Sequence, residues 1–191
     1  MSLPQPLVLA SRSPRRRELL EMLGIPIRVE AADIQEIPLP REAPLAYAQR
    51  LARDKARAVT GAFVLGADTI VVVDGEILEK PSDEAAAVAM LRRLAGRRHE
   101  VITAVALLAE GELHEAHEVT GVWFAAADEA TLRAYVAVGE SMDKAGAYSV
   151  QGCGAVLVER IEGDFFGVMG LPLRKVLELL ARAGHPYRFG G

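Results

Sequence analysis

The feature that most constrains the fold is a nearly continuous apolar run at residues 62–73, interrupted by one charged residue, Asp68. A run of this kind is typical of a strand buried on both faces of a sheet. It is well short of the ~20 apolar residues that a membrane-spanning helix requires. The Asp74-Gly75 pair that follows favours a tight turn into a second strand. We therefore expect a core built around a central strand that contains an acid.

Helices and strands alternate in the first part of the chain, whereas hairpins dominate the later part. Apolar runs and turn residues predict strands at 7–10, 27–31, 63–73, 76–78, 101–109, 113–124, 155–159 and 165–168. Helical spacing and capping residues predict helices at 14–23, 44–60, 82–95, 128–138 and 172–183. The strands at 101–109 and 113–124 should form a hairpin turned at Glu110-Gly111, and the last two strands should form one turned at Gly163. This order predicts an α/β protein with a mixed sheet, and because no repeat or linker is visible, a single domain over residues 1–191.

Composition excludes several classes of function. The 22 basic residues against 26 acidic ones give a net charge of −4, which argues against a whole-surface nucleic-acid binder. The single cysteine, Cys153, excludes an internal disulfide and a multi-cysteine metal site. At the N-terminus the apolar residues 7–10 precede the arginines, which is not the order of a signal peptide. We therefore expect a cytoplasmic protein with no membrane partner.

Four arginines, at positions 12, 15, 16 and 17, crowd the predicted start of the first helix. A helix N-terminus already carries about half a positive charge, so cations there are unfavourable unless an anion is bound. For Arg12 and Arg17 taken singly, a solvated basic turn explains the residue equally well. For Ser11 with Arg15 and Arg16 as a group, the hydroxyl, the guanidinium groups and the free N–H groups favour a site for a phosphate-type anion.

Other charged residues stand where folding alone favours apolar ones. Buried in its strand, Asp68 needs either a buried partner or a metal ion, since an unpaired carboxylate there costs several kcal/mol. It is a candidate base or metal ligand, and a structural role is equally open. Lys55 lies within the apolar stripe of the helix at 44–60, so it either extends its ammonium to the edge of the core or reaches into a cleft. Glu36 could supply the second carboxylate of a divalent-ion site; Lys80 is either at the same site or simply on the surface.

Residues 143–152 combine titratable groups, an aromatic residue and two glycines, which is unusual for an inert connection. The amide of Gln151 could read the edge of a base, and a plain surface loop is the alternative. Elsewhere, His114 and His117 should point to opposite faces of a strand, exposed to solvent, and hold no metal together. Cys153 is expected to pack in the interior.

Two further residues give no indication of function from the sequence. Trp123 is expected to pack in the interior, and His99 gives no functional signal.

Six sequence blocks resemble, in order, those of the Maf family of nucleoside triphosphate pyrophosphatases. They are S-x-S-P-R-R at 11–16, R-x-K-A at 53–56, G-A-D-T at 66–69, E-K-P at 79–81, D-K-A-G-A-Y-x-x-Q-G at 143–152 and G-L-P at 170–172. The resemblance extends over nearly the whole chain. Arg15, Thr69 and Gln151 match the branch of the family that hydrolyses dTTP and UTP, whereas the branch that acts on 7-methyl-GTP has Trp, Gln and Glu at these positions.

The resemblance implies a Maf/ITPase-like fold, which is a two-lobed α/β single domain around a curved mixed β-sheet with a central cleft, often as a homodimer. It implies hydrolysis of a nucleoside triphosphate to the monophosphate and pyrophosphate, with Mg²⁺ or Mn²⁺, in nucleotide-pool house-cleaning. By position, Asp68 is expected to be the proton acceptor and, with Glu36, the metal-binding group. The expected phosphate-binding residues are Ser11, Arg15, Arg16, Lys55 and Lys80, and the expected base-selecting residues are Arg15, Thr69 and Gln151.

The sequence leaves alternatives to this activity open. The substrate could be a modified pyrimidine triphosphate, or it could be 7-methyl-GTP or another modified purine nucleotide. The chain could also be a nucleotide-binding regulator of septum formation, since members of the family have been linked to that process. The complete set of charged positions favours the enzyme.

Overall fold

The structure, a computed structural model, describes residues 3–189, so the two outermost residues at each end of the expected 1–191 domain lie outside the described residues. The chain forms two compact units. Unit 1 contains the chain up to Asp68, Thr103–Glu118 and the residues from Gly170 onward; unit 2 contains Thr69–Ile102 and Val119–Met169. The expectation of one domain stays a prediction.

Backbone hydrogen bonds order the described strands β2-β1-β3-β5-β6-β7, with β4 paired to β3. β1 is parallel to β2 and β3, whereas β4 is antiparallel to β3, and β7 to β6. The predicted α/β class with a mixed sheet is therefore confirmed. The strands are β1 Leu7–Leu9, β2 Ile27–Val29, β3 Phe63–Val73, β4 Glu76–Leu78, β5 Arg98–Ala109, β6 Glu112–Phe124 and β7 Val158–Glu162.

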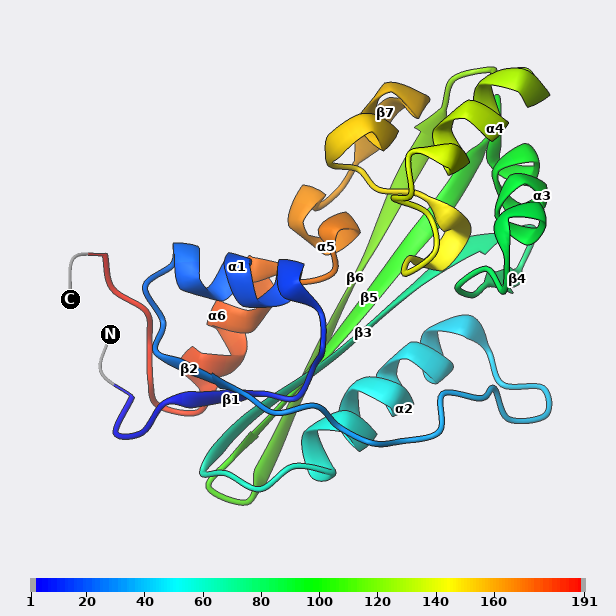
Figure 1. Cartoon of the computed structure of the whole chain (residues 1–191). Coiled ribbons are helices and arrows are strands. Elements are labelled where there is room, and N and C mark those ends of the chain that lie inside the picture. Colours follow the sequence, from blue (N-terminus) through cyan, green and yellow to red (C-terminus); the bar gives the residue numbers. More distant parts are fainter. Residues whose placement is uncertain (1–2, 190–191) are drawn as a thin grey trace. The chain divides into compact units, whose positions relative to one another are not determined.

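In unit 1, α1 connects the parallel strands β1 and β2. The helices of this unit are α1 Pro14–Met22, α2 Pro44–Arg57 and α6 Leu173–Arg182. Figure 1 shows α1 and α6 on one side of the unit 1 strands and α2 on the other side. The strands of this unit are therefore covered on both faces, which explains the continuous apolar run around Asp68.

Local sequence signals set the ends of the unit 1 helices. Ser13 caps α1 by accepting the Arg16 N–H, Pro14 holds the first helical position, and Gly24 follows the helix with φ +67°. The expected 44–60 helix ends earlier, at Arg57. Val59 and Thr60 follow it, and both are β-branched residues that disfavour helix.

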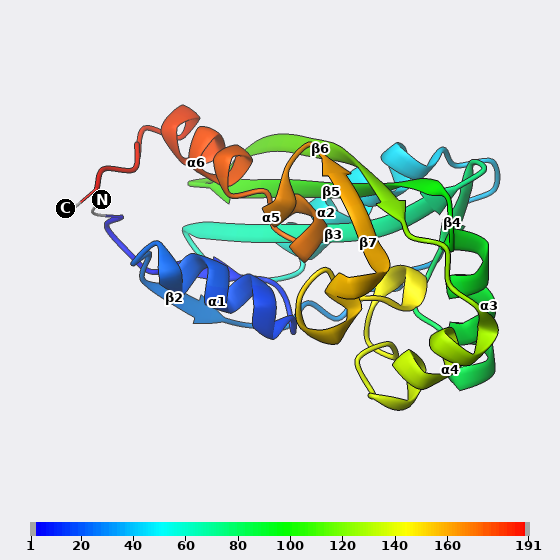
Figure 2. The same cartoon turned by 90° about the horizontal axis from the view of Figure 1, so that it is seen from above.

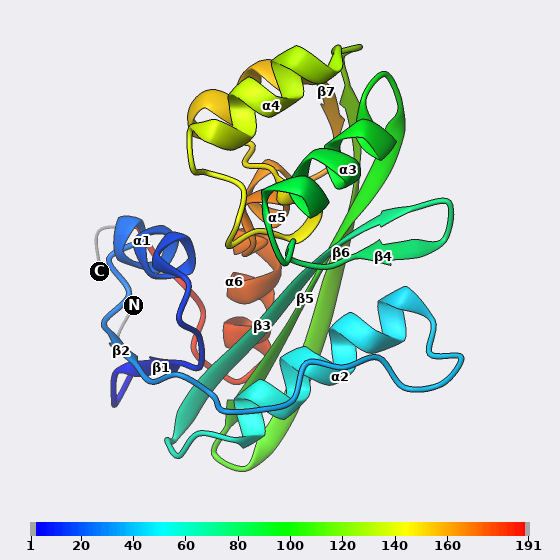
Figure 3. The same ribbon diagram turned by 45° about the vertical axis from the view of Figure 1, so that its right-hand side comes forward.

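Unit 2 contains two helices beside its strands, α3 Glu84–Leu94 and α4 Glu129–Ala137. Asp83 caps α3 and Asp128 caps α4, each by accepting a backbone N–H three residues along. Figure 3 shows the two helices side by side. Their apolar faces join one hydrophobic core with β3, β5 and β6, which gives the later elements a fixed support.

The two early hairpin turns follow the prediction. β3 turns into β4 through Asp74 and Gly75, and β5 turns into β6 through Glu110 and Gly111; all four residues have positive φ. Such turns match the twist of the flanking strands. The outcome shows that short-range turn signals were sufficient for both hairpins.

The predicted hairpin of 155–159 and 165–168 is wrong. Gly152–Leu157 is a 3-10 helix, and β7 pairs antiparallel with β6, as Figure 2 shows. Phe165–Met169 forms a short helix, α5, because Asp164 Oδ1 accepts the Gly167 N–H at 2.8 Å. The apolar run resembled a strand, but the capping aspartate and the pairing of β7 with β6 decided the local structure.

Several smaller expectations are also corrected. Cys153 is exposed and does not pack in the interior. His114 and His117 are both half-buried, and His117 Nδ1 lies 3.3 Å from Gln49 Nε2 in α2.

Trp123 is half-buried and packs through its ring, with the Arg160 guanidinium 3.8 Å from the ring centroid.

Within residues 3–189, no helix is long and apolar enough to cross a membrane.

Candidate active site

Asp68 has a buried cationic partner. Its side chain is 5% exposed in β3, and its Oδ1 accepts a hydrogen bond from Lys55 Nζ at 2.7 Å. Lys55, itself 8% exposed, also pairs with Glu36 Oε1 at 2.9 Å. Asp68 thus has a lysine as its buried partner, and the ammonium of Lys55 lies between this buried carboxylate and the exposed carboxylate of Glu36.

Gly66 allows this pairing by letting α2 approach β3 closely. A Cβ atom at Gly66 would lie 2.1 Å from the Ala52 carbonyl oxygen and 2.6 Å from the Ala56 nitrogen. Gly66 and Asp68 are two residues apart, so they share one face of the strand. Lys55 precedes Ala56 on the helix. The contact that only glycine permits therefore brings Lys55 and Asp68 together.

The loop that carries Glu36 is fastened to the same helix. Arg50 in α2 donates to both carboxylate oxygens of Glu42 at 2.7 Å and to the Ile37 carbonyl at 3.0 Å. The hydrogen bonds from Arg50 lower the pKa of Glu42 to about 2. This bidentate ion pair fixes the loop beside the turn of α2 that presents Lys55.

Arg16 connects three segments of unit 1 through a buried guanidinium. Its Nε donates to the Gly170 carbonyl at 2.7 Å, and its Nη1 donates to the Ala67 carbonyl at 2.9 Å and to Ser11 Oγ at 3.2 Å. Burial lowers the pKa of Arg16, and the nearby charge of Asp68 opposes that shift. Arg16 therefore fixes the backbone directly beside Asp68. We name Ser11, Arg16, Glu36, Lys55 and Asp68 the charged cluster.

Arg15 lies beside this cluster. After burial and the charge of Asp68, the charge of Arg15 is the next influence on the pKa of Arg16. Arg15 is half-buried, whereas Arg12 is exposed and Arg17 pairs with Glu21 at 3.4 Å on the surface. For Arg17 the solvated basic turn is thus the better description. The first turn of α1 contains no acid, which leaves its positive end suited to an anion.

The remaining predicted residues belong to unit 2. Thr69 follows Asp68 directly in β3, Lys80 is exposed after β4, and Gln151 is exposed just before the 3-10 helix Gly152–Leu157. Within this unit, the Gly146 N–H donates to the Glu79 carbonyl at 3.3 Å. The block that contains Lys80 and the block that contains Gln151 are therefore joined, although they lie far apart in the sequence.

The charged cluster offers a suitable donor set for a hard divalent cation. Asp68 and Glu36 approach the same Lys55 nitrogen, so two carboxylates converge on one point. In residues 3–189 no group of three or more His, Cys, Asp or Glu side chains is arranged to hold a metal by itself. Mg²⁺ commonly binds through one or two carboxylates together with substrate phosphates. The residues present fit that mode.

A model of the family described as "Maf-like protein" matches residues 6–183. The chain belongs to this Maf-like family. Proteins named dTTP/UTP pyrophosphatase are similar over nearly the full chain. The one from Symbiobacterium thermophilum is 50% identical over 191 residues, covering 98% of both chains, and the one from Geobacter sulfurreducens is 52% identical over 185 residues, covering 93% of this chain and 96% of the relative. The Staphylococcus aureus Ham1 protein gives a TM-score of 0.46 at 18% identity, over 63% of this chain and 72% of that chain.

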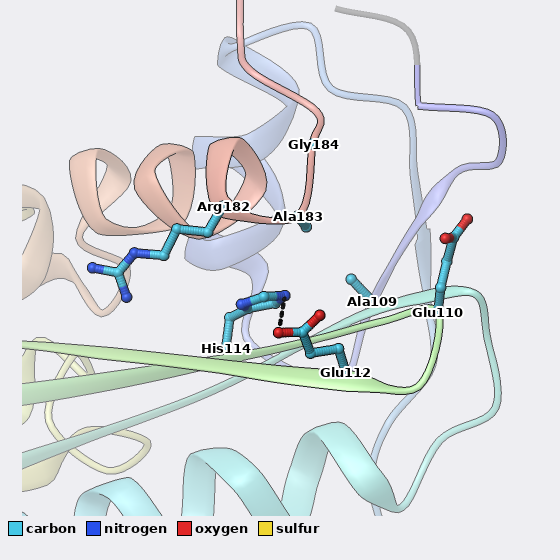
Figure 4. A pocket seen from close by; sticks show the side chains of 7 residues that line it. All are labelled: Ala109, Glu110, Glu112, His114, Arg182, Ala183 and Gly184. Atoms are coloured by element: carbon cyan, nitrogen blue, oxygen red, sulfur yellow. Dashed lines mark ion pairs between the residues drawn. The ribbon is translucent and has the colours of Figure 1, made fainter.

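This Maf-like protein also has a pocket that the residues of the charged cluster do not line. Its volume is about 400 Å³, and Figure 4 shows it between the β5–β6 turn and the end of α6. His114 Nε2 and Glu112 Oε1 lie 4.0 Å apart at its wall. None of the predicted site residues lines it, so it does not enter the proposed activity.

Three features of the structure were not predicted from the sequence. Two are the carbonyl groups of Ala67 and Gly170, which accept hydrogen bonds from Arg16. A main-chain carbonyl has no residue-type signature, although Gly170 does belong to the G-L-P block. The third is His99, which is 2% exposed in β5 of unit 2. Its position two residues before the apolar segment that begins at Val101 was the available signal.

Proposed function

We propose that this Maf-like protein hydrolyses dTTP and UTP to the nucleoside monophosphate and pyrophosphate. The observation that carries the proposal is the charged cluster of unit 1, in which the buried side chains of Asp68, Lys55 and Arg16 lie together with the more exposed carboxylate of Glu36. The names of relatives about 50% identical over nearly the full chain support the choice of substrates. Modified pyrimidine triphosphates fall within the same proposal.

The cations have a clear electrostatic task in this reaction. A nucleoside triphosphate carries a charge of about −4, and negative charge accumulates on the departing pyrophosphate. Preorganised cations stabilise such charge without reorganising during the reaction. The residues proposed to bind the phosphates are Ser11, Arg15, Arg16, Lys55 and Lys80.

Asp68 is proposed to orient the attacking water and to accept its proton. The oxygen of that water bonds to the α-phosphorus, and the bond from this phosphorus to the oxygen that bridges it to the β-phosphorus breaks, so that the electron pair leaves with pyrophosphate. Because β3 and Lys55 hold the carboxylate of Asp68 in place, it needs little rearrangement to act as the base. Each carboxylate in the cluster also has a second oxygen beyond the one that binds Nζ.

Asp68 and Glu36 are the residues proposed to hold Mg²⁺ or Mn²⁺ together with the substrate. Such an ion, when bound, neutralises phosphate charge and makes a bound water more acidic. Lys55 can support this arrangement because its ammonium has three donors and a flexible stem, so it can leave one carboxylate for a phosphate oxygen.

Selection of the base is proposed to rest on Arg15, Thr69 and Gln151. A pyrimidine edge offers both donors and acceptors, and the amide of Gln151 can match either.

We further propose that the chain is a single domain, that it forms a homodimer and that it is located in the cytoplasm. Its partner is proposed to be a small-molecule substrate and not a nucleic acid or a membrane.

The test is a substrate panel of dTTP, UTP and 7-methyl-GTP, each with Mn²⁺ and with a chelator, followed by measurement of pyrophosphate. We expect turnover of dTTP and UTP with metal and little with chelator. Preferential turnover of 7-methyl-GTP would replace the substrate assignment, and the absence of turnover with all three would refute the enzyme. In that last case the regulator of septum formation becomes the better hypothesis, and an Asp68→Asn variant that keeps regulation would support it.

A further inference from the structure

The segment that presents Gln151 has an unusual backbone. We name residues 145–154 the Gln151 loop. Gly146 and Ala147 are both in the left-handed region, with φ +67° and +60°. A Cβ atom at Gly146 would lie 2.9 Å from the Val71 side chain, so the loop lies tightly against β3. Because alanine rarely adopts positive φ, its surroundings must hold this conformation in place.

One contact that holds the loop is a buried pair of polar rings. Tyr148 is 5% exposed, and its hydroxyl lies 2.8 Å from Nε2 of His99 in β5. Phe124 of β6 completes a cluster of three rings that meet edge to face, with centroids 4.7–5.4 Å apart. The ring cluster joins the loop to the two long strands of the unit 2 core.

If His99 served only to pack the core, its burial would destabilise the fold more than an apolar side chain would. Its Nδ1 is buried and has no hydrogen-bond partner among residues 3–189. Burial, together with the charge of Arg98, lowers the pKa of His99 to about 4, so the ring is neutral at pH 7. An apolar side chain of similar shape would avoid the cost of the unpaired nitrogen. The hydrogen bond to Tyr148 is the feature that an apolar ring cannot supply.

Two further anchors lie on either side of Gln151. The Tyr135 hydroxyl in α4 accepts the Ser149 N–H at 3.0 Å. Glu140 accepts the N–H groups of Cys153 and Gly154 at 3.1 and 3.2 Å. Gln151 itself is exposed, yet its backbone lies between points that are held by Tyr135 and by Glu140.

We propose that His99, acting through Tyr148, is a positioning residue that fixes the Gln151 loop for reading the pyrimidine base. The inference rests on the proposed function, since it takes Gln151 to contact the base. His99 does not touch the substrate in this scheme. It restricts the loop to one conformation, so that the amide of Gln151 meets the base without an ordering cost at the moment of binding.

The test compares His99→Phe, which keeps a ring but removes both nitrogens, with His99→Gln, whose amide can again reach the Tyr148 hydroxyl. We measure kcat and KM for UTP and for 7-methyl-GTP, and hydrogen exchange of the loop amides. For His99→Phe we expect KM for UTP to rise about tenfold while kcat changes less than about threefold. Exchange should accelerate in residues 145–154 and not in α3. His99→Gln should restore most of the UTP affinity.

A second variant keeps the proposal falsifiable if His99→Phe fails to fold. Tyr148→Phe removes only the hydroxyl and should produce the same rise in KM and the same local exchange. A folded variant of either kind with unchanged KM, unchanged preference for UTP and unchanged loop exchange overturns the positioning role. These outcomes differ from failure of the proposed function, in which the wild-type protein itself produces no pyrophosphate and the inference falls with it.

Discussion

The two units hold their functional residues by different physical means. In unit 1, the charged cluster is organised by the buried Lys55–Asp68 ion pair, by a second ion pair from Lys55 to the exposed Glu36, and by a guanidinium bound to main-chain carbonyls. In unit 2, the Gln151 loop is organised by a neutral pair of rings, a tyrosine hydroxyl and an aromatic core. The comparison indicates that each region matches its proposed task. Charge is required where phosphates are bound, whereas shape and directional hydrogen bonds are required where an uncharged base is read.

The largest effect should follow from removing the charge of Asp68. In Asp68→Asn we expect turnover of UTP to fall at least ~10²-fold, the size typical of a lost general base. Folding should persist because Lys55 keeps its pair with Glu36. The measurement is steady-state pyrophosphate release together with a thermal unfolding curve.

The matched control for this variant is Asp54→Asn, one residue from Lys55 on α2 but with a partly exposed side chain. The control should retain its activity. A wild-type rate in Asp68→Asn would remove the proposed difference between the regions, since the charged cluster would then have no chemical role.

The next effect concerns the close contact that builds the charged cluster. Gly66→Ala places a methyl group 2.1 Å from the Ala52 carbonyl, so α2 must move away from β3. We expect a loss of ~1–3 kcal/mol in the free energy of unfolding, as for other overpacked sites, and a fall in turnover as Lys55 is displaced. Chemical denaturation and kinetics on one preparation measure both.

Gly75→Ala separates packing from backbone strain. No atom lies within 4 Å of a Cβ at this position, but its φ is +77°. It should therefore destabilise the protein by only ~1 kcal/mol and leave turnover unchanged. Equal losses of activity in the two variants would contradict the role assigned to the contact at Gly66.

A smaller and more selective effect is expected in the Gln151 loop. Gln151→Glu places a negative charge where we propose the amide meets the base, so kcat/KM for UTP should fall about tenfold. Stability should not change, because the side chain is exposed. Gln5→Glu, also exposed, controls for the added charge. UTP kinetics identical to those of the wild type would count against the assignment of base reading to this loop.

The smallest effect is a pH-dependent change in the free energy of unfolding, caused by the Glu42–Arg50 ion pair that holds the loop carrying Glu36. The pKa of Glu42 is lowered from 4.5 to about 2, so its stabilising contribution is present above pH 4.5 and is lost as the pH falls toward 2. In Glu42→Gln we expect the free energy of unfolding to decrease by ~1 kcal/mol at pH 7. The difference from the wild type should shrink between pH 4.5 and 2 in urea titrations. A constant difference over that range would contradict the ion pair with Arg50.

Features determined by neighbouring residues were predictable from the sequence. The cap at Ser13, the turn at Asp74-Gly75 and the full extent of β3 follow from local chemistry and agree with the structure. The structure of the region after Gly154 was not predictable in this way, because β7 pairs with β6, some forty positions earlier in the chain. An apolar run alone cannot distinguish a short helix such as α5 from a strand.

The site divides in the same way. Asp68 and Lys55 were identifiable because a charge within an apolar pattern requires an explanation. Their direct pairing depends on the close packing at Gly66, which no pattern of polarity reports. The carbonyl partners of Arg16 and the partner of His99 are supplied by distant segments, so only the folded chain reveals them.

The exposed thiol of Cys153 has a practical consequence. It stands two positions after Gln151, its backbone N–H is anchored by Glu140, and the sequence holds no second cysteine. A maleimide dye or nitroxide would therefore attach at one defined point without any engineering. A label on this native thiol would report directly on the loop that we propose reads the base, so the proposed binding of a nucleotide could be followed in real time.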